Sequence, residues 1–433
     1  MTEELEPQEL DVDELTRTFA PACRVAVLSM HTSPLEQPGA GDAGGLNVYV
    51  RQVAEAMTAR RVYTDVYTRR TSPDEPDVRE VLPGVRVFSI DAGPPRPVHK
   101  DRLRRLVRRF VDGVEARATL DGPYDLVHAH YWLSAIAGAE LKQRWGVPLL
   151  VSFHSLERSK GESEAIPAAA SRIRGERRVV RAADRLIAGS EAERDHLVEL
   201  YGADPERVAV VPLGVDHEVF HPRGREAARK RFGFGDAPTV VFVGRLQPLK
   251  GPDVAVSALG RLSRIVPDAQ LVIAGGDSPR GHTGETMRLV LAARRLGVVR
   301  RVTFLDPLPH RDLADLYRAA DAVVIPSASE TFGLVALEAA ACGAPVVATA
   351  VGGLRRLVRD GQTGYLVPRR DPAAFAAALS RVITDPAARD RLGANAVELA
   401  RSYPWSRTAD GVLRAYAAVM ACPSERGELS GVN

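Results

Sequence analysis

Cysteine is scarce in this chain, and its few cysteines stand far apart. Cys23, Cys342 and Cys422 are odd in number, and no two of them have the short spacing of a metal site. A disulfide framework and a cysteine-based zinc site are therefore not expected. The same scarcity predicts a reduced, cytoplasmic setting.

Long apolar runs and a strong net charge are missing as well. No run approaches the roughly 18 apolar residues of a membrane-spanning helix. The first residues are acidic and lack an apolar core, so we expect no signal peptide. A net charge of +3 on 433 residues gives no bulk attraction to polyanions. We therefore expect neither nucleic acid nor an integral membrane as a partner.

The chain does contain a repeated alternation of short apolar runs and helical patterns. Runs such as RVAVLSM (24–30) and DLVHAHY (125–131) predict buried strands of a parallel α/β fold. After a stretch at 208–222 that contains Pro and Gly, the same alternation of apolar runs and helical patterns begins again with TVVFVGRL (239–246). Because 433 residues exceed what one core usually serves, we expect two doubly wound, Rossmann-like domains. Ligands of such sheets bind beyond the carboxyl ends of the strands, so the domains should face each other across a cleft.

The strongest motif of the second half is PSASETFGLVALEAAACGAPVVAT (326–349). Glu330 lies in the loop before a predicted helix that opens near Phe332, and Glu338 lies inside that helix. A carboxylate beside a Gly-containing turn can accept both hydroxyls of a ribose, and the helix amino-terminus favours a diphosphate. Without further context, two such glutamates are usually solvated helix residues.

A basic pair stands upstream in VGRLQPLKG (243–251). Arg245 and Lys250 follow a predicted strand, and two cations there suit a diphosphate leaving group whose charge grows as the bond breaks. Two solvated surface cations are the ordinary alternative. The combination of this pair with the two glutamates and Gly352–Gly353 favours a functional site.

These motifs resemble those of the family-four glycosyltransferases of the GT-B fold. The family pattern G-R-x-x-x-x-K-G, then E-x-F-G, then a glutamate followed by A-x-A-x-G-x-P-V-V is nearly intact, and the resemblance covers about residues 23–420. It implies a retaining hexosyltransferase with a nucleotide-sugar donor, most simply a UDP-sugar. The donor-binding residues that it implies are Arg245 and Lys250 at the diphosphate, Glu330 at the transferred sugar, Glu338 at the ribose, and Phe332, Gly333 and Leu334.

The first half carries a Gly-rich turn directly after its first strand, in MHTSPLEQPGAGDAGGLNVYV (30–50). Gly44 and Gly45 would let the backbone approach the donor phosphates, although many α/β turns carry glycines for shape alone. HAHYWLS and SFHSLERSK end two later strands, so the side chains of Asn47, Tyr131, His154, Ser155 and Lys160 could converge on the cleft. A structural role for His154 is about as common as a functional one, and its strand-end position favours function.

These first-half motifs resemble the actinobacterial D-inositol-3-phosphate glycosyltransferases. HTSP, QPG-x-GD-x-GG-x-NVYV and H-x-HYWLS nearly repeat that pattern. The resemblance implies Gly45 at the donor diphosphate, Asn47 at the acceptor ring and His154 near the donor sugar. It further implies that the acceptor phosphate is held by cations and hydroxyls that converge on it, namely Lys100, Tyr131, Ser155 and Arg172.

Part of the first half is more similar to sucrose-phosphate synthases. SFHSLERSK and RIRGER (172–177) follow their pattern, and this likeness makes Lys160 and Arg172 the phosphate ligands. Asn47, however, stands where those enzymes carry glutamine, and Leu308 stands where some inositol-phosphate enzymes have arginine. Three acceptors therefore stay open: inositol 3-phosphate, a sugar phosphate, and an unphosphorylated polar acceptor of specialised metabolism.

The resemblance also implies the mechanism and the partners. We expect attack from the face that the diphosphate leaves, with no metal and no cofactor beyond the donor, and a homodimer is compatible with the family. A silent nucleotide-sugar binder would have lost the site residues, and a pyridoxal-phosphate-dependent phosphorylase would not retain the E-x-F-G motif. The expected organisation is disorder over 1–21, an acceptor domain over 22–213, a donor domain over 214–404, a helix over 405–421 that crosses back, and a tail over 422–433.

Overall fold

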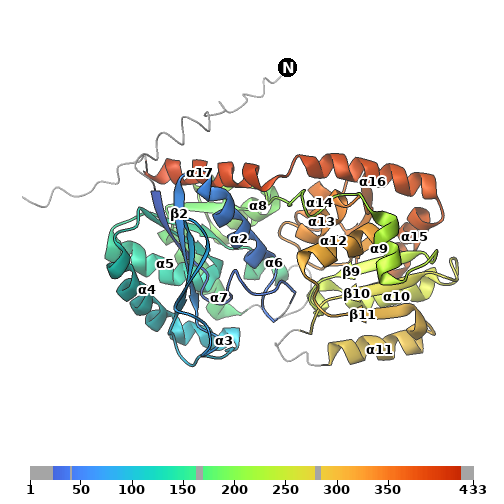
Figure 1. Cartoon of the computed structure of the whole chain (residues 1–433), viewed down its shortest axis with the longest axis horizontal. Helices are drawn as coiled ribbons and strands as arrows, with labels where there is room; N and C mark the ends of the chain where they lie inside the picture. Colours follow the sequence, from blue (N-terminus) through green and yellow to red (C-terminus); the bar gives the residue numbers. More distant parts are fainter. Residues whose placement is uncertain (1–22, 40, 162–168, 278–283, 421–433) are drawn as a thin grey trace, which may run out of the picture.

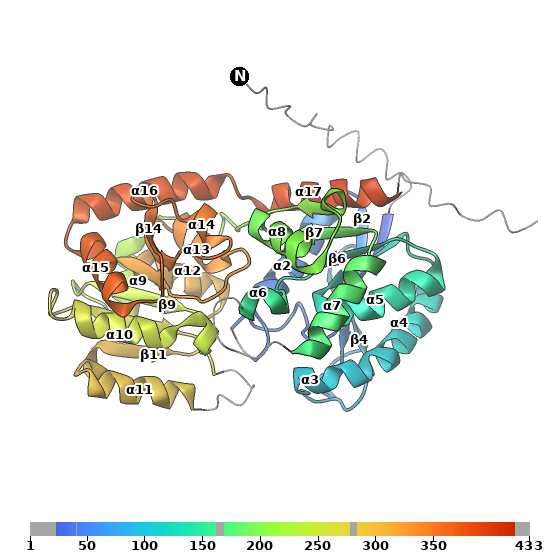
Figure 2. The same cartoon turned by 180° about the vertical axis from the view of Figure 1, so that it is seen from behind.

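The computed structural model describes residues 23–39, 41–161, 169–277 and 284–420. They form two lobes, and each lobe is a parallel sheet with helices packed on it (Figure 1). The view from behind shows the same two lobes side by side (Figure 2). The prediction of an α/β protein with two doubly wound units is confirmed.

The first sheet has its strands in the order β3-β4-β2-β1-β5-β6-β7-β8, and β3 alone pairs antiparallel. The chain order reverses at β1, which lies between β2 and β5. Such a reversal opens a crevice beyond the carboxyl ends of the strands. The strands are β1 (Cys23–Leu28), β2 (Val62–Arg69), β3 (Val78–Leu82), β4 (Val85–Ile90), β5 (Leu126–His130), β6 (Leu149–Ser152), β7 (Arg185–Ala188) and β8 (Val208–Val210). Its main helices are α2 (Gly45–Thr58), α4 (Val107–Asp121), α5 (Tyr131–Trp145), α7 (Ala170–Ala182) and α8 (Glu191–Tyr201).

The second sheet is parallel throughout and has the order β11-β10-β9-β12-β13-β14, with its reversal at β9. The strands are β9 (Thr239–Val243), β10 (Gln270–Ala274), β11 (Val302–Leu305), β12 (Ala322–Ile325), β13 (Val346–Thr349) and β14 (Gly364–Val367). Its main helices are α9 (Arg225–Phe232), α10 (Pro252–Leu262), α11 (Glu285–Arg295), α12 (His310–Ala319), α13 (Leu334–Ala341), α15 (Pro372–Ile383) and α16 (Pro386–Arg401). The central strands β9, β10, β12 and β13 are buried on both faces, as parallel strands between helices require, whereas the edge strand β11 is partly exposed.

The last helix, α17 (Trp405–Met420), belongs to the first lobe although it follows α16 of the second (Figure 1). It packs against α2 and β7, and the Tyr416 hydroxyl is hydrogen-bonded to His128 Nδ1 at 2.9 Å. The two connections between the lobes run side by side. Val215 N–H donates to the Tyr403 carbonyl at 2.8 Å, and a Cβ on Gly214 would lie 2.6 Å from Trp405 N. Only glycine fits that crossing.

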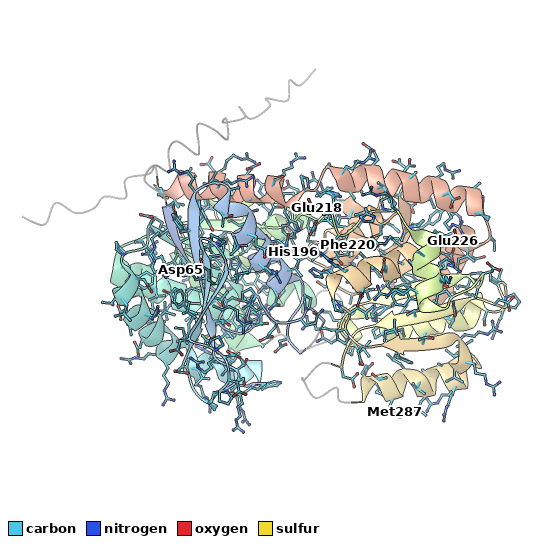
Figure 3. The ribbon with its side chains drawn as sticks, in the orientation of Figure 1. Asp65, His196, Glu218, Phe220, Glu226 and Met287 are labelled. Carbon is cyan, nitrogen blue, oxygen red and sulfur yellow. The ribbon has the colours of Figure 1, made fainter. Side chains whose placement is uncertain are left out.

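Each sheet carries a buried aspartate surrounded by cations. In the first lobe Asp65, labelled in Figure 3, accepts from Arg24, Arg86 and the Tyr124 hydroxyl. Burial alone would raise the pKa of Asp65, but these hydrogen bonds lower it below its usual value. Buried carboxylates are stable only when they are paired in this way.

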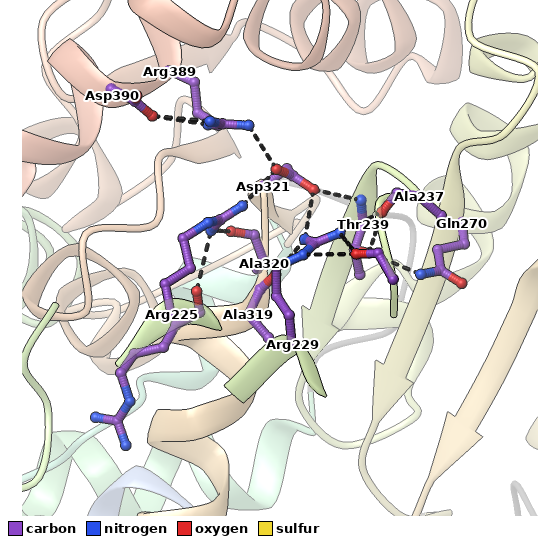
Figure 4. Close-up of polar contacts among 12 residues, drawn as sticks. Arg225, Arg229, Ala237, Thr239, Gln270, Ala319, Ala320, Asp321, Arg389 and Asp390 are labelled. Carbon is purple, nitrogen blue, oxygen red and sulfur yellow. Dashed lines mark hydrogen bonds and ion pairs between the residues drawn. The ribbon is translucent and has the colours of Figure 1, made fainter. Parts of the chain in front are cut away.

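The corresponding residue of the second lobe is Asp321, at the start of β12 (Figure 4). Its carboxylate accepts from Arg225 Nη2 at 2.6 Å, Arg389 Nη1 at 2.9 Å and Arg229 Nη1 at 3.1 Å. The backbone N–H of Thr239 donates to it at 2.8 Å. One side chain therefore joins α9, α16 and two strands.

We expect Asp321→Ala to lower the free energy of unfolding by about 2–4 kcal/mol, because it leaves three partly exposed arginines and the buried Thr239 N–H without their acceptor. Chemical denaturation followed by circular dichroism measures the loss. Asp390→Ala is the matched control, since Asp390 also pairs with Arg389 but is 72% exposed, and it should cost less than about 1 kcal/mol. Equal losses in the two variants would contradict this account of the Asp321 cluster.

Candidate active site

The carboxyl ends of strands from both sheets line one cavity between the lobes. It encloses about 240 Å³. The first lobe contributes the loop after β1, the start of α2 and the residues after β5, β6 and β7. The second lobe contributes the loops after β9 and β12. A second cavity of about 170 Å³ adjoins it and shares Gly44, Gly45, Arg245, Lys250 and Glu330 with it.

The loop after β1 is held in shape by Asn47. Asn47 Oδ1 accepts from the Gly44 N–H at 2.8 Å, and its Nδ2 donates to Thr32 Oγ1 at 2.7 Å and to the Ser33 carbonyl. Asn47 is only 1% exposed. The loop therefore presents Gly44 and Gly45 at the amino-terminus of α2. The contact between Asn47 and an acceptor ring stays a prediction.

Three of the predicted acceptor residues lie together in the first lobe. Arg172 Nη1 donates to the Tyr131 hydroxyl at 3.1 Å, and its Nη2 donates to the Ser155 carbonyl at 2.7 Å and to Ser155 Oγ at 3.2 Å. Two carboxylates that the sequence reasoning missed also hold this guanidinium, Glu176 at 2.7 Å and Glu157 at 3.1 Å. The spacing of Arg172 and Glu176, four residues apart on α7, could have signalled that pair.

The two predicted lysine ligands are placed only through their backbone. Lys100 opens the short helix α3 (Lys100–Leu103), and Lys160 lies in α6 (Glu157–Gly161). Both side chains lie outside the part of the chain that the structure describes. Their contacts with an acceptor phosphate stay predictions.

The predicted donor residues meet at the cavity from the second lobe. Lys250 Nζ lies 2.6 Å from Glu330 Oε2, and both side chains are mostly buried. Arg245 Nη1 lies 3.7 Å from Asp42 Oδ1 of the loop after β1, so this ion pair crosses from one lobe to the other. Asp42 therefore acts as the partner of Arg245 across the cleft.

Gly352 and Gly353 support the loop that carries Glu330. A Cβ on Gly352 would lie 1.8 Å from the Glu330 carbonyl oxygen, and its φ of +45° is in the left-handed region. Gly353 N–H donates to the same carbonyl at 3.2 Å. Gly333, with φ of +104°, begins α13 directly behind Phe332. Larger residues at these positions would displace the loop.

Glu338 is more buried than Glu330 and lines the adjoining cavity, together with Leu308 and Leu334, but not the first one. The Tyr317 hydroxyl donates to Glu338 Oε2 at 3.1 Å. Burial raises the pKa of Glu338 to about 8, although the bond from Tyr317 opposes that rise. Tyr317 was not anticipated, because it comes from α12 and no local spacing connects it to Glu338.

His154 stands where the lobes meet. Its Nε2 is hydrogen-bonded to His130 Nδ1 at 2.9 Å, and its carbonyl oxygen accepts from Thr331 Oγ1 at 3.0 Å. The Thr331 carbonyl in turn accepts from Ser190 Oγ at 2.7 Å. The loop that carries Glu330 is therefore attached to the first lobe by two hydrogen bonds. Thr331, Ser190 and His130 were all missed by the sequence reasoning.

A further cavity of about 360 Å³ shares Glu193, Glu330 and Thr331 with the first one. His196 of α8, labelled in Figure 3, and Arg355 of α14 (Leu354–Leu357) line it. Glu193 lines both this cavity and the first one. Its Oε2 accepts from the Gly189 N–H at 2.7 Å, and burial raises its pKa to about 7.

Comparison with known proteins agrees with this geometry. The family model of glycosyl transferases group 1 matches residues 224–399, and that of the glycosyl transferase 4-like domain matches residues 44–214. A D-inositol 3-phosphate glycosyltransferase of Thermomonospora curvata is 46% identical over 412 residues, covering 92% of this chain and 95% of that protein. One of Actinosynnema mirum is 49% identical over 405 residues, covering 91% and 96%.

The chain belongs to this glycosyltransferase family. Among solved structures, sucrose-phosphate synthase of Thermosynechococcus elongatus is 34% identical with a TM-score of 0.86, covering 92% of this chain and 99% of that one. Anabaena HepE, solved with UDP and glucose, shares the fold at 22% identity with a TM-score of 0.73, covering 92% and 100%. These neighbours confirm the GT-B fold. The resemblance to the inositol-phosphate enzymes is confirmed by the curated relatives.

Two general findings complete the description of this glycosyltransferase. Among the helices that the structure describes, none is long and apolar enough to cross a membrane. Within the same described ranges, no group of three or more His, Cys, Asp and Glu side chains is arranged to hold a metal ion.

We expect Gly352→Ala to reduce the rate of transfer about 100-fold, because the new Cβ displaces the Glu330 loop by an ångström or more. Steady-state kinetics measure the loss. Gly361→Ala is the matched control: Gly361 also has a positive φ, of +70°, but no atom lies within 4 Å of its would-be Cβ. It should cost about 1 kcal/mol of stability and leave the rate unchanged. A Gly352→Ala enzyme of normal activity would show that the loop position does not matter.

Proposed function

We propose that this glycosyltransferase moves N-acetylglucosamine, or another hexose, from a UDP-sugar to inositol 3-phosphate with retention of anomeric configuration. The observation that carries the proposal is that one cavity is lined by polar groups of both lobes. Arg245 and Lys250 line it from the second lobe, and Tyr131 and Ser155, which Arg172 contacts from behind, line it from the first. The D-inositol 3-phosphate glycosyltransferases that are 46–49% identical to this chain support the acceptor.

The donor half of the cleft is suited to a diphosphate. Arg245 and Lys250 would stabilise the charge that develops on the departing phosphate, and the backbone N–H groups of Gly44 and Gly45 lie at a helix amino-terminus. Lys250 is already paired with Glu330 at 2.6 Å, so donor binding would rearrange an existing ion pair. Glu338 would accept from the ribose hydroxyls, and its burial favours a neutral donor group as partner.

The acceptor half of the cleft has a fixed arginine behind Tyr131 and Ser155. Arg172 is 6% exposed and stacks over the Tyr131 ring at 4.8 Å, so its position is set before any ligand arrives. In the reaction that we propose, the departing phosphate oxygen takes the proton of the attacking hydroxyl on the same face of the sugar. Positioning of the two substrates and electrostatic stabilisation of the leaving group would lower the activation barrier, with no covalent intermediate.

A second candidate is transfer to a sugar phosphate. The match to sucrose-phosphate synthase, at 34% identity and a TM-score of 0.86, favours it. An unphosphorylated polar acceptor is a third candidate, because Arg172 is already engaged by Glu157 and Glu176.

We expect UDP release from UDP-N-acetylglucosamine to depend on 1D-myo-inositol 3-phosphate and to be much slower with myo-inositol, because the Arg172 cluster binds the phosphate. Coupled detection of UDP together with product mass measures both. Fructose 6-phosphate is the test of the second candidate. Equal rates with the phosphorylated and unphosphorylated acceptors would contradict the assignment of an acceptor phosphate to Arg172.

We expect Lys250→Ala to lose most of the turnover, on the order of 100-fold or more, with only a modest loss of UDP affinity. The reason is that the leaving-group charge is larger in the transition state than in the bound donor. Initial rates and calorimetric UDP binding separate the two effects. Lys230→Ala, an exposed lysine of α9, is the control and should be neutral. Unchanged turnover in Lys250→Ala would remove this lysine from the mechanism.

A further inference from the structure

Strand β5 carries two buried histidines near its end, His128 and His130, which have no role in the transfer reaction proposed above. They are 1% and 2% exposed. Their ring centroids are 4.2 Å apart, and the His130 ring lies 5.2 Å from that of His154 at the end of the neighbouring strand β6. Burying three imidazole rings at the end of a sheet lowers the stability of the fold unless each buried ring nitrogen has a hydrogen-bond partner.

The partners of the three rings are different. His128 is satisfied within the first lobe, since its Nε2 is bonded to Ser152 Oγ at 3.0 Å and its Nδ1 to the Tyr416 hydroxyl. His130 instead uses its Nδ1 to bond His154 Nε2 at 2.9 Å. A bond between two imidazole nitrogens needs one N–H and one bare nitrogen, so the two rings cannot both be cationic.

The surroundings favour the neutral form of both rings. Burial lowers the pKa of His154 to about 3. Burial, and then the neighbours His128, His154 and His31, lower the pKa of His130 well below its usual value. The other titratable groups that face the pair are Tyr49 of α2, whose ring lies 5.0 Å from that of His154, and Glu193, which lines the same cavity.

The backbone of His154 shows that its position is imposed. Its φ is +59°, and Tyr131, the first residue of α5, has φ of +74°. Left-handed backbone costs a non-glycine residue about 1–2 kcal/mol, so the surrounding contacts must stabilise it. In this conformation the His154 carbonyl meets Thr331 of the second lobe while its ring meets His130 of the first.

We propose that His130 is a positioning residue of the transferase reaction, whose Nδ1 holds the imidazole of His154 at the cavity wall as a neutral group of fixed orientation. This inference rests on the proposed function of the cavity as the transfer site. An imidazole held in this way presents a dipole to the sugar and carries no positive charge. A cationic imidazole would instead repel the positive charge that develops on the sugar carbon as the glycosidic bond breaks. His130 touches no substrate and acts through His154.

The test compares His130→Ala with His130→Asn, because the end of an asparagine side chain occupies the place of Nδ1 and can keep the bond. His128→Ala is the control, since it removes an equally buried histidine from the same strand without removing the bond to His154. We expect His130→Ala to lower kcat at least tenfold with unchanged UDP affinity. His130→Asn should keep at least half of the activity, and His128→Ala should lower Tm without lowering kcat more than about twofold.

Nitrogen-15 NMR of labelled histidine gives a readout that needs no substrate. In the unaltered protein His154 should show one protonated and one bare ring nitrogen down to about pH 5.5. In His130→Ala, where water enters, it should titrate closer to the ordinary histidine pKa of about 6.5, and kcat should then fall as the pH is lowered.

Titration of His154 near pH 6.5 in an active, unaltered enzyme would overturn this inference alone. Equal loss of kcat in His130→Ala and His128→Ala would also overturn it, since the effect would then be structural. A neutral, fixed His154 in a protein that transfers no sugar would overturn the proposed function instead.

Discussion

The hydrogen bond from Thr331 to the carbonyl oxygen of His154 is the contact on which the site depends. Thr331 sits next to Glu330, and His154 sits at the end of β6, so the bond joins the two lobes beside the groups that are assigned to chemistry. Ser190 adds a second bond to the same loop. The Arg245–Asp42 ion pair and the bond from Gln37 Nε2 to the Leu308 carbonyl also join the lobes, so a small set of contacts sets how the halves align.

The lobes themselves are made rigid by buried charge as well as by apolar packing. Asp65 of β2 binds Arg24 of β1 and Arg86 of β4, so it joins three strands. Asp321 binds arginines of α9 and α16, so it joins two helices to the sheet. Between the lobes, by contrast, the chain passes only through the paired segments near Gly214 and Tyr403. Such an arrangement keeps each half stiff and leaves their relative position to a few contacts, which suits a site that must admit and release two substrates.

Much of the fold and part of the site could be predicted from the sequence. The strands could be predicted from short apolar runs. Arg245, Lys250 and Glu330 could be predicted to lie at the cleft because each stands in a short motif after a strand, and Glu338 because it follows in the helix of the same motif. Gly352 could be predicted because it too stands in a short motif after a strand. The partners of these residues could not be found, because Tyr317, Thr331, Glu176 and His130 reach their contacts through tertiary structure that no local spacing encodes. Asn47 was anticipated as a ligand-facing residue, and its hydrogen bonds within its own loop could be known only from the folded chain.

The central claim is that the sugar is transferred within this cleft from the same face that the diphosphate leaves, with no covalent intermediate and no charged histidine. The most direct measurement is the anomeric configuration of the first product, read by proton NMR during the initial turnovers with an α-linked UDP-sugar. The account predicts an α-linked product. A β-linked product would contradict it, because it would require attack from the opposite face of the sugar.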